Sequence, residues 1–213
     1  MKFYPLFLNL KDRGVLLVGA GAIGLQKIKA LLECAARLHV VAPEALPEIQ
    51  AFAREGRIRW SARGYASGDL EDAALVIAAT DDPALQQRIA AECRSRKIWV
   101  NIVDVPPLCD FYAAAVASRG DVQVAISTGG AAPALAKYLR RKIETLLGPE
   151  YEDFTRLARN FRPAILKLPK DQRLVLWNRM VNDDFLDALR RDGPAQAETQ
   201  IKRWIEDAAH APS

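Results

Sequence analysis

The chain has little histidine and cysteine, and it has no long hydrophobic run. It contains only two histidines, His39 and His210, and three cysteines among 213 residues. An odd number of widely spaced cysteines argues against a disulfide framework and against a zinc site. No apolar run approaches the roughly 20 residues of a membrane-spanning helix, and charge interrupts the N-terminus too early for a signal peptide. We therefore expect a protein of the reducing cytoplasm, without a metal site of its own and with a structural role for His39.

The charge balance is mildly basic, with 30 Lys and Arg against 26 Asp and Glu and a net charge of +4. Such an excess suggests a polyanionic partner, either a nucleic acid or a small molecule. The basic residues are interleaved with acidic ones, and no motif of aromatic and basic residues typical of RNA binding occurs. We expect no nucleic-acid partner and no membrane partner, and we keep nucleic-acid binding only as an alternative with a steep salt dependence.

The most informative motif is G-x-G-x-x-G, formed by Gly19, Gly21 and Gly24. It follows an apolar run at 15–18 and precedes a helix-like segment at 22–35. In this motif the first glycine makes a tight turn, the second lets a pyrophosphate approach, and the third lets helix and strand pack closely. The pyrophosphate then lies against the free N–H groups at the start of the helix. The motif predicts a dinucleotide-binding unit.

Strand-like and helix-like segments alternate along the first half of the chain. Strands are predicted at 15–18, 38–41, 57–60, 75–79 and 98–102, and helices at 22–35, 45–55 and 83–96. This alternation is typical of an α/β fold with a Rossmann-type doubly wound parallel sheet.

The pattern changes after residue 104. Apolar runs at 111–117 and 122–127 predict a β-hairpin, 133–147 predicts a strong helix, and 150–209 reads as further helices. We therefore predict three domains: a dinucleotide-binding domain at 1–113, a small α+β module of hairpin and helix at 114–148, and a helical C-terminal domain at 149–213.

The choice of cofactor depends on the residues after the second predicted strand. A carboxylate about 20 residues beyond the last glycine usually binds the adenosine ribose, and this count from Gly24 leads to Glu44. Alternatively, Glu44 begins a helix, where an acidic side chain suits the helix dipole. No arginine follows at 45–47 to neutralise a 2′-phosphate, so the sequence favours NAD over NADP.

Polar residues follow the next two predicted strands, where ligands of open α/β sheets gather. Thr80 and Asp82 are expected to cap the helix that begins at Pro83, although Thr80 is also a candidate for a cofactor contact, as is Asn101. Asp104 follows the last strand beside the expected nicotinamide position. A carboxylate there can accept a proton from a substrate while a hydride leaves for NAD, or it can simply form a turn.

A second candidate site precedes the helix at 133–147. Hydroxyl groups and glycines lead into the start of this helix, which is a plausible place for an anion. Three basic side chains then share one helix face, at i, i+3 and i+4. The alternative is a solvated face with an ordinary cap. The candidates for substrate binding are Ser127, Thr128, Gly129, Lys137, Arg140 and Arg141.

Several motifs, in this order, resemble the precorrin-2 dehydrogenases of sirohaem synthesis, which occur as separate proteins or as the N-terminal part of a sirohaem synthase. The resemblance covers nearly the whole chain, most specifically 12–147, and implies the stand-alone form. Its motifs are Asp12-Arg13, Val18-Gly-Ala-Gly-Ala-Ile-Gly24, Ala78-Ala-Thr-Asp-Asp82, Asn101-Ile-Val-Asp104, Cys109-Asp-Phe111 and Ala125-Ile-Ser-Thr-Gly-Gly130.

The resemblance implies a specific reaction and specific roles. Precorrin-2, a tetrapyrrole with many carboxylates, would be oxidised to sirohydrochlorin by hydride transfer to NAD, and bifunctional members then act as a ferrochelatase (a lyase) that inserts Fe²⁺. Asp104 matches the catalytic aspartate of the family. The resemblance also implies a homodimer whose middle module, 114–147, exchanges contacts between protomers. The positions that match the family's NAD contacts are Ala22, Ile23, Pro43 and Glu44.

The chain departs from the resembled family at three positions. Ala114 replaces a usual proline, and Ala131 and Ala132 replace a polar pair that precedes the helix. These departures put in question any substrate contact of that pair, and with so few histidines chelation would depend on Asp104 and the macrocycle's own nitrogens. A non-catalytic NAD-sensing protein is the other function that we keep open.

Overall fold

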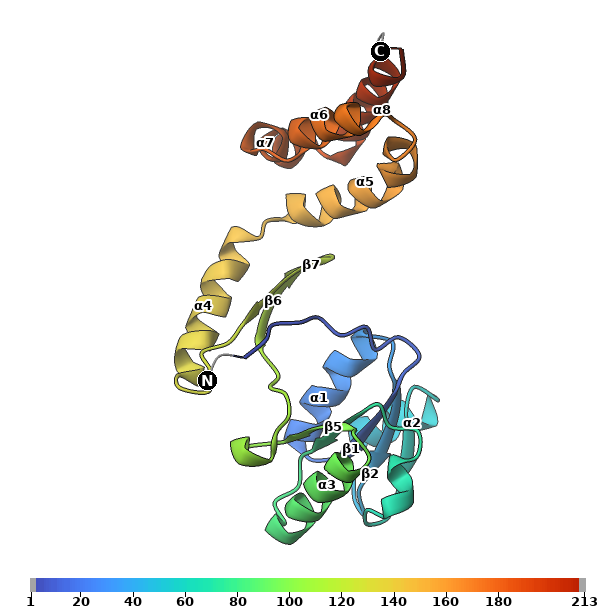
Figure 1. Ribbon diagram of the computed structural model, residues 1–213, viewed down its shortest axis with the longest axis vertical. Coiled ribbons are helices and arrows are strands. Elements are labelled where there is room, and N and C mark those ends of the chain that lie inside the picture. Colours follow the sequence, from blue (N-terminus) through green and yellow to red (C-terminus); the bar gives the residue numbers. More distant parts are fainter. Residues whose placement is uncertain (1–2, 211–213) are drawn as a thin grey trace. The chain divides into compact units, whose positions relative to one another are not determined.

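The protein forms two compact units, divided between Ala113 and Ala114. The structure is a computed structural model that describes residues 3–210 (Figure 1). None of the helices within that range has the length and apolar character needed to cross a membrane. A finer division of the second unit at residue 148 stays a prediction.

The first unit is built on a five-stranded parallel sheet with the order β3-β2-β1-β4-β5. From β1 the chain moves outward through β2 and β3, and it then returns to the other side of β1 for β4 and β5. This reversal is the topological switch point of a doubly wound sheet, and it confirms the predicted fold class. The strands are β1 (Gly14–Val18), β2 (Arg37–Val41), β3 (Arg59–Ser61), β4 (Leu75–Ala78) and β5 (Trp99–Ile102).

Helices cover both faces of this sheet because its central strands are apolar on both sides. On one face, Leu17 of β1 belongs to a core that includes Ile28 of α1 and Ile49 of α2. On the other face, Leu16 belongs to a core that includes Ile89 of α3. The helices are α1 (Ala22–Glu33), α2 (Pro47–Arg54) and α3 (Pro83–Ser95), with a short 3₁₀ helix, η2 (Pro106–Leu108), after β5.

The connection from β3 to β4 differs from the others. The structure describes every residue of this connection, which forms the 3₁₀ helix η1 (Ser67–Leu70) but no α-helix. Leu70 packs into the core on the α3 side of the sheet. The third strand itself starts two residues later than the sequence predicts, because the Arg57 N–H still donates to the Phe52 carbonyl at the end of α2.

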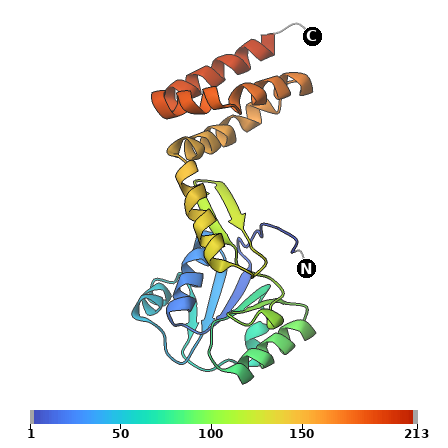
Figure 2. The same ribbon diagram turned by 90° about the vertical axis from the view of Figure 1, so that its left-hand side faces the viewer.

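The second unit begins with a β-hairpin and a helix. Strands β6 (Ala115–Arg119) and β7 (Val122–Ile126) pair antiparallel, and α4 (Pro133–Leu146) lies along this two-stranded ribbon (Figure 2). The predicted first strand of the hairpin, 111–117, is wrong at its start. Residues 111–114 are not in a strand, and the carbonyl of the first of them, Phe111, instead accepts a hydrogen bond from the Asn101 side chain of β5 (2.8 Å).

Four helices complete the second unit around a separate core. Leu157, Ile165, Met180 and Ile201 are fully buried there, as expected for amphipathic helices that bury one stripe each. The helices are α5 (Pro149–Ile165), α6 (Lys170–Met180), α7 (Asp183–Asp192) and α8 (Pro194–His210).

A buried carboxylate links three elements of this unit. Glu150, at the start of α5, has a fully buried side chain and accepts a hydrogen bond of 2.5 Å from the Arg190 guanidinium on α7. The bond from Arg190 lowers the pKa of Glu150, so this carboxylate stays ionised. Arg119 of β6 donates to the Leu147 carbonyl just before α5 (3.1 Å). The hairpin, α5 and α7 therefore meet around Glu150.

Replacing Glu150 tests this link. Glu150→Gln should destabilise α5 and α7 by about 1–3 kcal/mol, because Arg190 loses its ionised acceptor. The measurement is hydrogen exchange of the amides of these two helices. The folded pKa is lowered, so the stabilisation is complete above the unfolded pKa and its loss should begin below about pH 4. Asp187→Asn is the matched control: this exposed carboxylate also contacts Arg190 (3.1 Å), and its loss should cost less than about 0.5 kcal/mol.

Candidate dinucleotide site

The candidate site lies at the carboxyl ends of the strands in the first unit. Because β2, β1, β4 and β5 are neighbours in that order, the segments that follow them lie side by side along one edge of the sheet. Glu44 follows β2, the glycine loop follows β1, Thr80 follows β4 and Asp104 follows β5. The outer strands of this group are three spacings apart, about 14 Å. The edge can therefore accommodate an extended ligand.

Gly19 and Gly24 are required by the protein's own packing. Gly19 has φ +100°, and a Cβ added there would lie 2.1 Å from the carbonyl oxygen of Ala79. A Cβ on Gly24 would lie 2.6 Å from the carbonyl oxygen of Gly19. Any side chain at either position would collide with backbone. These two glycines bring the start of α1 close to the ends of β1 and β4.

Gly21 is different, because a Cβ there would meet no atom of the protein within 4 Å. It precedes α1 as the N-cap, and no side chain caps the helix. The first intrahelical bond runs from Leu25 N–H to the Gly21 carbonyl, so the N–H groups of Ala22 and Ile23 have no intrahelical acceptor. Open space beside free N–H groups fits the pyrophosphate of a dinucleotide.

Glu44 is free to act at the adenosine end of such a ligand. Pro43 and Glu44 are exposed and precede α2, which begins only at Pro47. The alternative that Glu44 begins a helix is therefore wrong, and Glu48 is the acidic residue of the first turn. The contact of Glu44 with a ribose stays a prediction.

Asp82 is the N-cap of α3, as the sequence predicts. Its Oδ1 accepts hydrogen bonds from the backbone N–H groups of Ala84 (2.9 Å) and Leu85 (3.1 Å). The Thr80 hydroxyl lies 3.4 Å from the Asp82 nitrogen, and the Thr80 carbonyl accepts a bond of 2.6 Å from the Gln86 side chain. Thr80 is thus part of the turn into α3, and its proposed cofactor contact stays a prediction.

Asp104 is exposed and has φ +61°, in the left-handed region. Few residues other than glycine adopt this conformation, and aspartate is one of the better tolerated. Non-glycine residues in this region are often found at functional sites, where the surrounding structure holds them in place.

The loop that carries Asp104 is held by two side chains that flank it. Asn101 is buried, and its amide donates to the Phe111 carbonyl (2.8 Å) and lies 3.5 Å from Cys109 Sγ. The Cys109 thiol donates to the Ile102 carbonyl (3.0 Å). Burial raises the pKa of this thiol, so it keeps its proton at neutral pH. Asn101 therefore positions the loop, and its proposed contact with the cofactor stays a prediction.

Two hydrogen bonds to Val100 of β5 hold the far end of the same loop. The Asp110 N–H donates to the Val100 carbonyl (2.8 Å), and the Asp110 carboxylate accepts from the Val100 N–H (3.1 Å). Sequence reasoning missed the roles of Cys109 and Asp110. The short Cys109-Asp-Phe111 motif marked these residues, but it has no periodicity from which pairing with β5 could be predicted.

The candidates for substrate binding all lie in the second unit. The Ser127 hydroxyl accepts from the Gly129 N–H (3.2 Å), and the Thr128 hydroxyl accepts from the Ala132 N–H (3.2 Å), so both shape the turn before α4. Ala132 is the N-cap of α4 and provides no side-chain cap. The missing polar pair thus leaves the start of this helix uncapped.

The three basic residues of α4 differ in their partners. Arg140 pairs with Glu144 at 2.5 Å. Within residues 3–210, no carboxylate lies within 4.0 Å of the Lys137 amine or the Arg141 guanidinium, both of which are exposed. The same described range contains no cluster of three His, Cys, Asp or Glu side chains that could hold a metal ion.

Comparison with known proteins identifies the family. A family model described as "Putative NAD(P)-binding" matches residues 6–115, about half of the chain. A second model, for the central part of sirohaem biosynthesis proteins, matches residues 119–146. The chain belongs to the family that the first model describes, the putative NAD(P)-binding proteins.

Curated members of this family are longer than the chain. It is 40% identical over 211 residues to a siroheme synthase of Ectopseudomonas mendocina, with 98% of this chain and 45% of that protein aligned. It is 39% identical to a siroheme synthase of Azotobacter vinelandii, with 98% and 46% aligned. The chain thus spans about half the length of these relatives.

A solved structure matches nearly the whole chain. SirC, a precorrin-2 dehydrogenase, superposes with a TM-score of 0.78 at 27% identity, covering 94% of this chain and 100% of that one. The Rossmann-type sheet and the helical C-terminal region therefore belong to an architecture already observed in the family.

The different surroundings of the glycines give a matched pair of variants. Gly21→Ala should leave the melting temperature nearly unchanged but weaken NAD binding about tenfold or more, because a methyl group there meets only the ligand. Gly24→Ala should destabilise the first unit by about 1–3 kcal/mol, because its methyl group meets backbone. Calorimetric titration with NAD and thermal unfolding measure the two effects. Unchanged NAD affinity in Gly21→Ala would contradict the proposed path of the pyrophosphate.

Proposed function

We propose that the protein oxidises precorrin-2 to sirohydrochlorin with NAD as the hydride acceptor. The observation that carries this proposal is the placement of two features along one edge of the sheet. The open space at Gly21 follows β1, and Asp104 follows β5. The match to SirC over its whole length supports the same reaction.

NAD fits the residues of this edge better than NADP does. Glu44 is exposed after β2, where it can accept hydrogen bonds from both ribose hydroxyls. A 2′-phosphate would meet its negative charge, and no arginine stands at 45–47 to offset it. The bound NAD supplies the acceptor for the hydride. Gly19 and Gly24 place α1, and the N–H groups of Ala22 and Ile23 bind the pyrophosphate.

Asp104 is proposed as the base of the reaction. Oxidation removes one hydride and one proton from precorrin-2; the hydride goes to NAD, and the Asp104 carboxylate accepts the proton. The loop bonds of Asn101 and Cys109 fix the backbone on either side of this carboxylate. The backbone of Asp104 is thereby held in place, while its side chain stays exposed and within reach of a substrate.

The polyacid substrate calls for basic groups, and α4 offers them. Lys137 and Arg141 can each bind a carboxylate of precorrin-2, whereas Arg140 already pairs with Glu144. At the start of α4, which no side chain caps, the Ala134 N–H has no partner within the described residues, and with the hydroxyl groups of Ser127 and Thr128 and the turn at Gly129 it can receive a further carboxylate.

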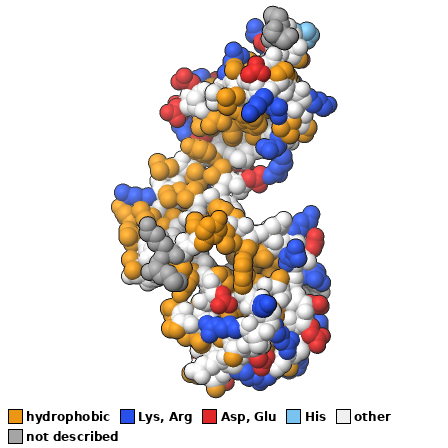
Figure 3. Space-filling view, viewed as in Figure 1, with side chains coloured by type: hydrophobic (Ala, Val, Ile, Leu, Met, Phe, Trp, Pro, Cys, Tyr) orange, Lys and Arg blue, Asp and Glu red, His pale blue; other side chains and the backbone are white. Residues whose placement is uncertain are grey.

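We further propose that the protein is a homodimer joined through residues 114–147. Val116 of β6 and Leu135, Tyr138 and Leu146 of α4 are exposed large hydrophobic residues. On the face drawn in Figure 3, hydrophobic side chains gather over α4. A second copy of the same module would cover them.

We also propose that the enzyme is cytoplasmic, because its cysteines are free.

Replacing Asp104 tests the chemical step. Asp104→Asn should lower kcat for precorrin-2 oxidation about 10²–10⁴-fold, with little change in NAD affinity, and asparagine tolerates the left-handed backbone equally well. Asp12→Asn is the matched control, because Asp12 is also exposed with a left-handed φ of 59° but precedes β1. Turnover is followed as the rise of sirohydrochlorin absorbance.

Two outcomes of this assay would change the assignment. Unchanged turnover in Asp104→Asn removes Asp104 from the reaction. Wild-type protein that binds NAD but does not oxidise verified precorrin-2 indicates an NAD sensor instead of an enzyme. Adding Fe²⁺ to the sirohydrochlorin formed, with and without the protein, tests iron insertion as a second activity.

The dimer can be tested separately from the chemistry. Leu135→Asp should weaken self-association by about 2 kcal/mol, roughly 30-fold, because a charge would be buried against the second copy. Leu174→Asp on α6 is the control, since Leu174 is also an exposed leucine but lies outside residues 114–147. Sedimentation equilibrium measures both. Equal association of the two variants would contradict the proposed interface.

A further inference from the structure

A hollow of about 460 Å³ opens over the amino-terminal halves of β1 and β2. It is lined by Gly14 and Leu16 of β1 and by Arg37 and His39 of β2, with Arg59 of β3 beside them. These residues lie toward the strand ends opposite the glycine loop. The hollow is therefore separate from the candidate dinucleotide site.

The hollow exists because one connection of the sheet lacks a helix. Between β3 and β4 the described chain forms only η1, and Leu70 covers the sheet nearer its centre. The residues of β2 and β3 that face the opening are polar: His39 is paired in register with Arg59, whereas Leu38 and Val40 point into the core on the other face. Polar and apolar residues therefore alternate along this part of β2, as expected for a strand with one open face and one buried face.

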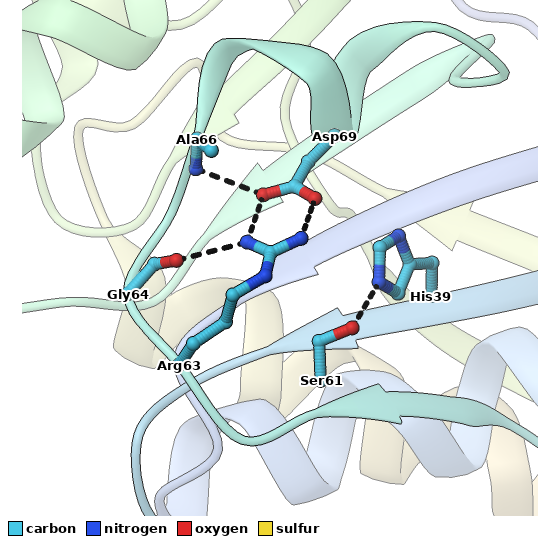
Figure 4. A network of polar contacts seen from close by, with 6 residues as sticks. All are labelled: His39, Ser61, Arg63, Gly64, Ala66 and Asp69. Carbon is cyan, nitrogen blue, oxygen red and sulfur yellow. Dashed lines mark hydrogen bonds and ion pairs between the residues drawn. The ribbon is translucent and has the colours of Figure 1, made fainter.

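One wall of the hollow is a fixed ion pair (Figure 4). Arg63 binds both carboxylate oxygens of Asp69, at 2.8 and 2.5 Å, and also donates to the Gly64 carbonyl at 2.9 Å. The Asp69 carboxylate accepts a further bond from the Ala66 N–H (2.9 Å). The Asp69 side chain is 4% exposed. Arg63 therefore balances the charge of Asp69 within the wall of the hollow.

Two further arginines of the hollow have no such partner. Within residues 3–210, no carboxylate lies within 4.0 Å of the Arg37 or Arg59 guanidinium. Arg37 is anchored only through its Nε, which donates to the Asp12 carbonyl at 3.0 Å, so its terminal nitrogens remain available. Glu71 and Asp72 also line the hollow, but they are exposed and form no ion pair with either arginine.

We propose that this hollow binds a small molecule through an oxyanion group, held by Arg37 and Arg59 with His39 beside it. Guanidinium groups match the geometry of phosphate, sulfate and carboxylate oxygens. The volume is within the range of small-molecule sites. This inference does not depend on the proposed dehydrogenase activity, and its test needs neither NAD nor a tetrapyrrole.

His39 gives the site a pH dependence and a spectroscopic signal. Burial lowers the pKa of His39, and Arg59 and Arg63 lower it further, whereas Asp69 raises it. Its Nε2 lies 3.0 Å from the Ser61 hydroxyl. The ring is therefore neutral at pH 7. An anion beside it favours the protonated ring, so binding must raise the His39 titration midpoint and tighten as the pH falls.

The experiment follows the two histidine rings by NMR in the full chain, with sulfate or chloride at constant ionic strength. Sulfate keeps its charge across the titration, so any coupled protonation belongs to the protein. We expect sulfate, but not chloride, to raise the His39 midpoint in a saturable way. His210, exposed at the end of α8, should respond equally to both salts. An equal response of His39 to both salts would overturn the proposal.

Paired variants separate the site from general charge effects. Arg59→Gln should weaken the sulfate dependence of His39 about tenfold or more, as the loss of a charge-assisted contact does. Arg57→Gln removes the same charge two residues earlier, but Arg57 stacks on Phe52 and pairs with Glu55, outside the hollow. It should change the affinity less than about threefold. An equal effect of both variants would also overturn the proposal.

Further titrations identify the kind of oxyanion. Phosphate and succinate are added in the same way at matched ionic strength. Tighter binding of phosphate than of succinate indicates a phosphorylated ligand, and the reverse order indicates a carboxylate ligand; either order supports the site. If none of the three anions moves His39 more than chloride does, the hollow does not bind oxyanions.

Discussion

The candidate site depends on one close backbone contact, between Gly19 and the carbonyl of Ala79. A Cβ at Gly19 would lie 2.1 Å from that oxygen, so only glycine lets the loop after β1 cross the loop after β4. Neighbouring bonds extend this contact along the edge of the sheet. Leu46 N–H donates to the Ala20 carbonyl on one side, and Val103 N–H donates to the Ala78 carbonyl on the other. The segments that carry Glu44 and Asp104 are thus tied to the same line of backbone.

Because backbone contacts build this edge of the sheet, the candidate site contains few charged side chains of its own. Its fixed electrostatic feature is the uncapped start of α1, where free N–H groups and the helix dipole favour an anion. Glu44 and Asp104 stand at the two ends of the edge and do not compete with each other. The basic side chains that we propose to bind the polyacid lie on α4, in the second unit. In this proposal, cofactor binding and substrate charge recognition are assigned to different parts of the chain.

The parts that could be predicted from sequence are those with a local cause. The glycine spacing, the apolar strands and the Asp82 cap each follow from neighbouring residues, and the structure has all three. The hydrogen bonds by which Cys109 and Asp110 hold the Asp104 loop could not be predicted, because they require that β5 is an edge strand with free backbone groups. The hollow at His39 depends in the same way on a missing helix between β3 and β4. Polar residues at alternate positions of β2 were visible, but only the sheet order shows that they face an opening.

The hydrogen bonds around the Asp104 loop bear on the two explanations of this residue, and its catalytic role stays a prediction. Asp104 lies in a turn closed by the bond from the Val105 N–H to the Ile102 carbonyl, a setting in which aspartate tolerates a left-handed backbone. No hydrogen bond within the described residues uses its carboxylate. Its left-handed backbone is of a kind that persists only where the surrounding structure holds it, and here the bonds of Asn101, Cys109 and Asp110 do so. The protein therefore fixes the backbone of this residue from both sides and leaves its side chain without a structural partner. A carboxylate left free in this way can accept a proton, which supports the role proposed for Asp104.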